Sequence, residues 1–212
     1  MTPTNKIKLK NEAQTREAVA FFAQSDERAP LLESTHYCEG YAATYERYPL
    51  YTAEDGKVVY EQFLRSAFDE ADMSDAIMQY DHRGMVFART SNGSLIVRAD
   101  ENGLLAAADL SLTDAARQMH DAIDKRLVTK MSWRFMPGEY YYDKETRTII
   151  HTKVKKVFDV SAVSFPANEG TEINARAWCD GVIDLAARSE AELEYRRRRL
   201  ANKIKIMEAM KK

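Results

Sequence analysis

Residues 157–163 constrain the fold more than any other segment, because they are apolar on both faces of an extended strand. The segment reads VFDVSAV, and a strand of this kind is typical of the middle of a sheet. Strict alternation places Asp159 and Ser161 on the same face as Val157 and Val163. A buried carboxylate is costly unless it is paired or hydrogen-bonded. Asp159 therefore needs a partner, either an imidazolium or a set of backbone amides.

The composition fits one core of ordinary domain size and excludes several classes of function. Of 212 residues, 45% are hydrophobic, and 31 basic against 33 acidic residues give a net charge of −2. That balance argues against a general coat for nucleic acid or a surface for anionic lipid. Cys38 and Cys179 are too far apart for a disulfide scaffold or a zinc ribbon. With no signal-peptide core and no membrane-length apolar run, we expect a soluble protein of a reducing cytosol. No glycine-rich phosphate loop supports nucleotide chemistry.

Short alternating segments predict a β-rich α+β fold, either a small barrel or a curved sheet surrounded by helices. These segments are residues 37–45, 58–63, 94–99, 104–110, 128–135, 139–142 and 147–165. Residues 101–103, Glu-Asn-Gly, predict a hairpin turn with positive φ angles. One amphipathic helix interrupts the strands, with Thr113 as its N-cap and an apolar stripe that ends at Leu127.

The distribution of charge divides the chain into three parts. Residues 1–34 are an N-terminal lead that we expect to be helical or partly disordered, residues 35–177 are the folded domain, and residues 178–212 are a basic tail. From Arg188 onward there are nine basic and four acidic residues, whereas the rest of the chain has 22 basic and 29 acidic residues. The tail predicts a helix capped at Ser189, with a solvated charged face or a surface that docks on an acidic partner.

Among the four histidines, His82 has the most suggestive surroundings. It lies in the segment from Met78 to Gly84, where a strand gives way to a turn, and such strand ends hold a side chain rigidly while leaving it accessible. His36, His120 and His151 show no comparable setting, and none of the four belongs to a metal-binding spacing such as HExxH. We therefore expect neither a metal nor a cofactor.

Ser132 lies in a strand whose two faces differ. In residues 130–135, Met131, Trp133 and Phe135 alternate with Ser132 and Arg134. A half-buried strand with a polar outer face explains this pattern without any chemistry. Ser132 becomes a candidate nucleophile only if a base lies beside it.

The chain resembles the prohead maturation proteases of tailed bacteriophages, which are serine peptidases distantly related to the herpesvirus assemblins. The resemblance runs from about Cys38 to Ala177 and rests on six segments in the family's order. One departure is Ser66, which stands where the family usually has glycine. The six segments are Gly40-Tyr41-Ala42, Ser66-Ala67-Phe68, Tyr80-Asp81-His82, Asp100 to Leu104, Lys130 to Phe135, and Asp159 to Asn168.

The resemblance implies a serine nucleophile at Ser132, a general base at His82 and an acid at Asp159 that orients the imidazole. The family usually has glutamate at the acidic position, so Ser161 or His151 stays open as the third member. Backbone amides of residues 165–168 are a candidate oxyanion hole by position alone. We expect Arg134, on the face of Ser132, to be simply solvated.

The resemblance also implies a place of action and a set of partners. Such proteases work inside the procapsid in the host cytoplasm, where they digest scaffolding or capsid precursor segments and usually themselves. It implies no membrane and no specific nucleic acid, and it leaves a homo-oligomer open. The alternative is a non-catalytic assembly or scaffolding protein of the same fold, in which Ser132 is only a strand residue.

Overall fold

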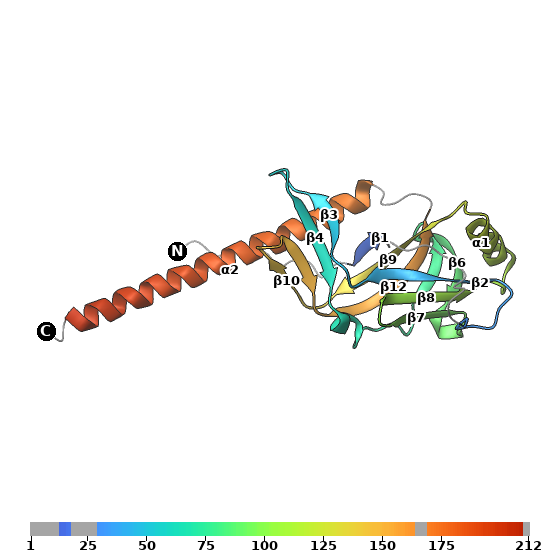
Figure 1. Cartoon of the computed structure of the whole chain (residues 1–212), viewed down its shortest axis with the longest axis horizontal. Coiled ribbons are helices and arrows are strands. Elements are labelled where there is room, and N and C mark those ends of the chain that lie inside the picture. The colour runs from blue at the N-terminus through green and yellow to red at the C-terminus, as the bar shows by residue number, and fades with distance from the viewer. Residues whose placement is uncertain (1–12, 18–28, 164–168, 210–212) are drawn as a thin grey trace.

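A computed structural model describes residues 13–17, 29–163 and 169–209 (Figure 1). Twelve strands in these ranges form three sheets. The first sheet has five strands in the order β1-β9-β12-β5-β6, the second has four in the order β10-β11-β4-β3, and the third has three in the order β2-β8-β7. The strands are β1 (Gln14–Glu17), β2 (Tyr37–Thr44), β3 (Tyr48–Thr52), β4 (Val58–Phe63), β5 (Ile77–Tyr80), β6 (Arg83–Arg89), β7 (Leu95–Ala99), β8 (Gly103–Asp109), β9 (Lys130–Pro137), β10 (Tyr140–Asp143), β11 (Thr148–His151) and β12 (Val154–Val163).

The expected β-rich α+β fold is confirmed, but the small barrel is wrong. Within the described ranges no sheet closes on itself, because the five-stranded sheet ends at β1 on one side and at β6 on the other. The twelve strands are instead divided among three sheets that pack on one another. The long segment predicted over residues 147–165 is likewise two strands, β11 and β12, which belong to different sheets.

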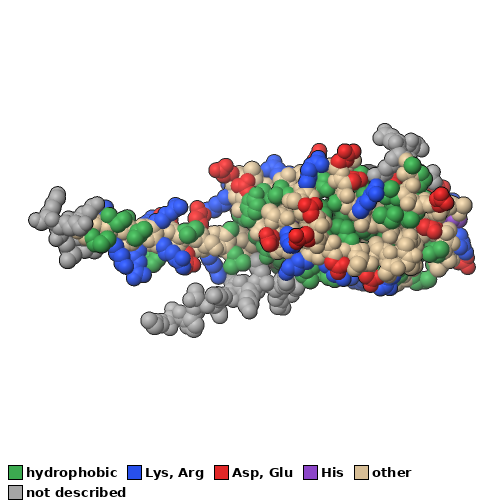
Figure 2. All heavy atoms as spheres, turned by 90° about the horizontal axis from the view of Figure 1, so that it is seen from below, with side chains coloured by type: hydrophobic (Ala, Val, Ile, Leu, Met, Phe, Trp, Pro, Cys, Tyr) green, Lys and Arg blue, Asp and Glu red, His purple; other side chains and the backbone are tan. Residues whose placement is uncertain are grey.

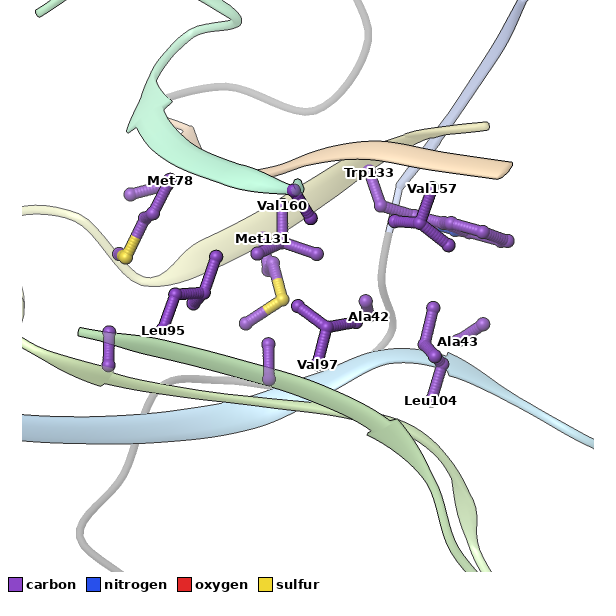
Figure 3. Close-up of a cluster of buried hydrophobic side chains, with 14 of the residues drawn as sticks. Ala42, Ala43, Met78, Leu95, Val97, Leu104, Met131, Trp133, Val157 and Val160 are labelled. Carbon is purple, nitrogen blue, oxygen red and sulfur yellow. The ribbon is translucent and has the colours of Figure 1, made fainter. Parts of the chain in front are cut away.

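The main core lies between the five-stranded and the three-stranded sheets (Figure 3). Met131 and Trp133 of β9 point into it from one side, and Leu95 and Val97 of β7 point into it from the other (Figure 3). All four side chains are buried. This packing leaves the opposite face of β9, which carries Ser132, turned away from the core.

The helix α1 (Asp114–Asp124) begins as the sequence predicts. The Thr113 hydroxyl accepts a hydrogen bond from the Ala116 backbone N–H at 3.1 Å, which satisfies one of the free donors of the first turn. The hairpin between β7 and β8 is also present, but the expected positive φ angles at residues 101–103 are wrong. Gly103 instead lies in β8, where a Cβ atom would come within 2.0 Å of the Ala43 carbonyl oxygen.

The C-terminal helix α2 (Glu169–Ala209) is longer than the sequence predicts. Ser189 is inside it rather than at its cap, and the boundary expected at residue 178 also falls within it. Trp178, Cys179 and Val182 are buried together with Val59 of β4 in a second core, so the base of the helix is anchored on the four-stranded sheet. The rest of α2 projects from the body with Lys and Arg side chains along it (Figures 1 and 2). No helix in the described ranges is long and apolar enough to cross a membrane.

The lead differs from its expected form at residues 14–17, which form β1 at the edge of the five-stranded sheet, next to β9. Four residues without clear alternation gave no strand signal in the sequence. Residues 14–17 are extended because they pair with β9, and not because of their own strand propensity.

Candidate active site

His82 is held in a two-residue hairpin turn between β5 and β6. Tyr80 pairs with Arg83, and the two turn residues, Asp81 and His82, have φ angles of 45° and 57°. Positive φ at both central residues is the geometry of a type I′ turn, which matches the twist of the flanking strands but strains residues other than glycine. The Asp81 N–H donates to the Ala162 carbonyl at 3.0 Å, which ties the turn to the neighbouring strand β12.

Ser132 lies on β9, the second strand of the five-stranded sheet, between β1 and β12. Its partner in the antiparallel pairing with β12 is Ser161. Ser132 and Ser161 are both buried, on the sheet face opposite to Trp133. A side chain in this position has little freedom, which suits a group that must be aimed at another atom.

A β-bulge in β12 places Asp159 on the face of Ser132. Val157 pairs with Phe135 and Asp159 pairs with Arg134, so Phe158 is an extra residue in the register. The expected shared face of Asp159 and Val157 is therefore wrong. Val157 points into the main core (Figure 3), whereas Asp159 faces the turn that carries His82.

The three candidate residues form one chain of contacts. His82 Nδ1 lies 2.5 Å from Asp159 Oδ1, and His82 Nε2 lies 2.7 Å from Ser132 Oγ. The Asp159 side chain is fully buried, whereas 20% of the His82 side chain is exposed. With the Nδ1 proton donated to the carboxylate, Nε2 is free to accept the hydroxyl proton of Ser132.

The Asp159 carboxylate has two further contacts. Ser161 Oγ donates to Asp159 Oδ1 at 2.8 Å, and Arg134 Nε lies 3.1 Å from Asp159 Oδ2. The expectation of a merely solvated Arg134 is therefore wrong, although 41% of its side chain is exposed. The alternation of β9 already placed Arg134 on the face of Ser132, but the bulge that brings Asp159 to this face is not readable from the sequence.

The other candidates lie elsewhere. His151 contacts Glu61 through Nε2 at 2.9 Å and stacks on Phe63 in the interior, away from the contact chain of His82. Residues 165–168, suggested as an oxyanion hole, lie outside the described residues. Ser132 Oγ also lies 3.0 Å from the carbonyl oxygen of Arg16 in β1.

Ser132, His82 and Asp159, linked by hydrogen bonds in this order, have the arrangement of a Ser-His-Asp triad. This arrangement recurs in hydrolases of unrelated folds. The sequence profile of the caudovirus prohead serine proteases matches residues 23–180, most of the chain. The chain belongs to this family, and it is therefore a serine peptidase of the capsid maturation kind. Searches of curated proteins and of solved structures found no match.

Proposed function

We propose that this protein is an endopeptidase that cleaves scaffolding or capsid precursor segments during procapsid maturation, with Ser132 as the nucleophile. The observation that carries the proposal is the continuous contact from Asp159 through His82 to Ser132, at 2.5 and 2.7 Å. Membership of the prohead protease family supports the class of substrate. Family members act inside the procapsid, so we propose the same location for this chain.

In the proposed mechanism His82 moves one proton and Asp159 holds the imidazole in place. Ser132 Oγ bonds to the scissile carbonyl carbon while its proton passes to His82 Nε2, and that proton then goes to the leaving amine. Water hydrolyses the resulting ester, and Ser132 regains its proton from His82. Asp159 stabilises the imidazolium, and Arg134 and Ser161 act as positioning residues that fix the carboxylate.

The projecting part of α2 is the proposed handle for assembly. It carries exposed apolar side chains between basic ones, including Leu193, Leu200 and Met207, and it extends away from the site (Figure 1). Leu193, Leu200 and Met207 are spaced by seven residues, the repeat of a coiled-coil seam. We propose that this helix docks on scaffolding or capsid protein.

Co-expression with the cognate capsid protein tests the proposed function. The parent should shorten the capsid precursor, whereas Ser132→Ala should leave it intact. Ser66→Ala, a change at an exposed serine, is the matched control and should behave like the parent. A precursor that is cut equally well with Ser132→Ala contradicts the role of Ser132 as the nucleophile. A precursor that is cut with neither protein favours a non-catalytic assembly protein.

A further inference from the structure

Strand β1 covers the edge of β9 that carries Ser132. It lies beside β9 (Figure 1) and pairs antiparallel with it. In this pairing Glu17 is opposite Ser132 and Arg16 is opposite Trp133. Without β1, the row of backbone donors and acceptors along β9 would be an open sheet edge, and such edges bind extended peptides by adding them as a strand. Strand β1 precedes residues 23–180, the part of the chain that matches the family. It therefore occupies the place that a substrate strand would take.

The backbone of Arg16 lies directly at the candidate nucleophile. Ser132 Oγ is 3.0 Å from the Arg16 carbonyl oxygen, and the carbonyl carbon is one bond of about 1.23 Å further along. Ser132 Oγ thus lies within hydrogen-bonding distance of both the Arg16 oxygen and His82 Nε2, and it has one proton for the two acceptors. A rotation of the peptide group would bring the carbon to the roughly 3 to 3.5 Å needed for attack. The bond at risk is the one between Arg16 and Glu17.

The side chain of Arg16 is buried against Glu61 and Phe135, and we call these surroundings the acidic pocket. Its Nε donates to Glu61 Oε2 at 2.6 Å and its Nη2 to Glu61 Oε1 at 2.8 Å, which is the two-pronged geometry of a strong arginine–carboxylate pair. The two side chains are 2% and 0% exposed. Tyr48 also donates to Glu61, and the guanidinium lies over the ring of Phe135 at 5.7 Å.

The buried carboxylate of Glu61 is stable only with a cation beside it. Burial alone would raise the pKa of Glu61, but the Arg16 charge and the hydrogen bond with His151 hold that pKa well below its ordinary value. A buried carboxylate that loses its partner is strongly unfavourable. The pocket therefore favours a basic side chain, and arginine over lysine because only arginine reaches both oxygens at once.

We propose that β1 is the enzyme's own first substrate: Arg16 occupies a pocket for a basic side chain built on Glu61, and the Arg16–Glu17 bond is cleaved by Ser132. This inference rests on the proposed function and adds a specificity residue and a cleavage position. Ser132 Oγ bonds to the Arg16 carbonyl carbon, the bond to the Glu17 nitrogen breaks, and His82 delivers the proton to that nitrogen. One water then releases Arg16 as a carboxylate and restores Ser132.

Until that bond is cut, β1 keeps other peptides away from β9. The uncut chain is thus self-inhibited, and cleavage in place opens the edge. The same pocket then selects precursor segments with a basic residue, preferably arginine, before the bond that is cut. Glu61 is a specificity-determining residue in this account, separate from the contact chain of His82.

Intact-mass measurement and N-terminal sequencing of the purified full chain test the cleavage position. The parent should acquire a new N-terminus at Glu17, and Ser132→Ala should not. Arg16→Glu places a carboxylate against Glu61, so it should remain uncut and release β1. Ser132 in Arg16→Glu should still react with a fluorophosphonate. Arg16→Lys keeps the charge and should still be cut at the same bond, but at least about 10-fold more slowly than the parent, because lysine cannot reach both oxygens of Glu61.

The outcomes separate this inference from the proposed function. A parent that stays uncut at Arg16, together with an Arg16→Glu variant labelled at Ser132, overturns the inference and leaves the peptidase intact. A folded Arg16→Glu variant that is neither labelled nor active on capsid precursor overturns the proposed function itself. Equal cleavage at Glu17 in Arg16→Glu and in the parent removes the acidic pocket as the reason for specificity.

A synthetic peptide of residues 11–20, NEAQTREAVA, tests the pocket in trans with the self-processed enzyme. Replacing its arginine by alanine should lower kcat/KM by about 100-fold, because a buried charge pair is lost. Glu61→Gln should remove most of that discrimination, whereas Glu70→Gln, at an exposed surface carboxylate, should keep it. Equal kcat/KM for the two peptides with the parent enzyme overturns the pocket assignment.

Discussion

At the scale of single residues, the site depends on a backbone strain at His82. The φ angle of 57° there belongs to the region that glycine enters freely and other residues enter at a cost. Such strain is tolerated where the surrounding structure fixes it and where it serves a function. Here it turns the imidazole toward both Asp159 and Ser132.

That strain predicts an inverted order of stability for two variants that both lack the imidazole. His82→Gly should have a free energy of unfolding about 1 kcal/mol higher than His82→Ala, because the Cβ atom of alanine still makes the positive φ angle unfavourable. Urea unfolding of the two proteins measures the difference. A His82→Ala protein as stable as His82→Gly would show that this turn is not strained at His82.

Asp159→Asn should lower the rate of capsid precursor cleavage by about 10⁴-fold, a loss of the size found when the triad acid is replaced elsewhere. The amide would donate to His82 Nδ1 and leave Nε2 protonated, so the imidazole could no longer accept the Ser132 proton. Single-turnover cleavage measures the rate, with Asp69→Asn, at an exposed carboxylate, as the control. A loss below 10-fold argues against Asp159 as the orienting acid.

At the scale of elements, the sequence predicts most strands but not the details that assemble the site. The strand over residues 58–63 and the helix after Thr113 follow directly from alternation and capping. The bulge at Phe158 does not, because an inserted residue reverses the faces without changing the composition of the segment. Strand β1 is invisible for another reason, since its order comes from pairing with β9 rather than from its own four residues.

The N-cap of α1 offers a test at this scale. Thr113→Ala should lower the free energy of unfolding by about 1 kcal/mol, because the Ala116 N–H loses its partner. Thr113→Ser keeps the hydroxyl and should change the free energy much less. Chemical denaturation compares the two, and equal losses would mean that the cap contributes nothing.

At the scale of the whole molecule, the small net charge of −2 is the sum of two opposite excesses in different parts of the chain. The body carries the acidic excess and the candidate site, whereas the projecting part of α2 carries basic side chains (Figure 2). Within the body, the ion pair of Arg16 and Glu61 links β1 to β4. Strand β1 is thereby connected to the four-stranded sheet as well as to β9.

This ion pair predicts how stability changes with pH. The pKa of Glu61 is lower in the folded protein than its ordinary value of 4.5, so its contribution is complete above that value and is lost as the pH falls below it. The free energy of unfolding should therefore drop on acidification from pH 5 to pH 2, and the drop should be about 1 to 3 kcal/mol smaller in Glu61→Gln. Glu54→Gln, at an exposed carboxylate, is the control, and an unchanged drop in Glu61→Gln contradicts this assignment.

The most direct measurement of the central claim is the position and rate of fluorophosphonate attachment, read by peptide mass spectrometry. The account predicts an adduct on Ser132, none at that position in Ser132→Ala, and labelling slowed by about 100-fold or more in His82→Ala. An adduct on another serine that persists in Ser132→Ala, or a His82→Ala protein labelled at the parent's rate, would contradict it.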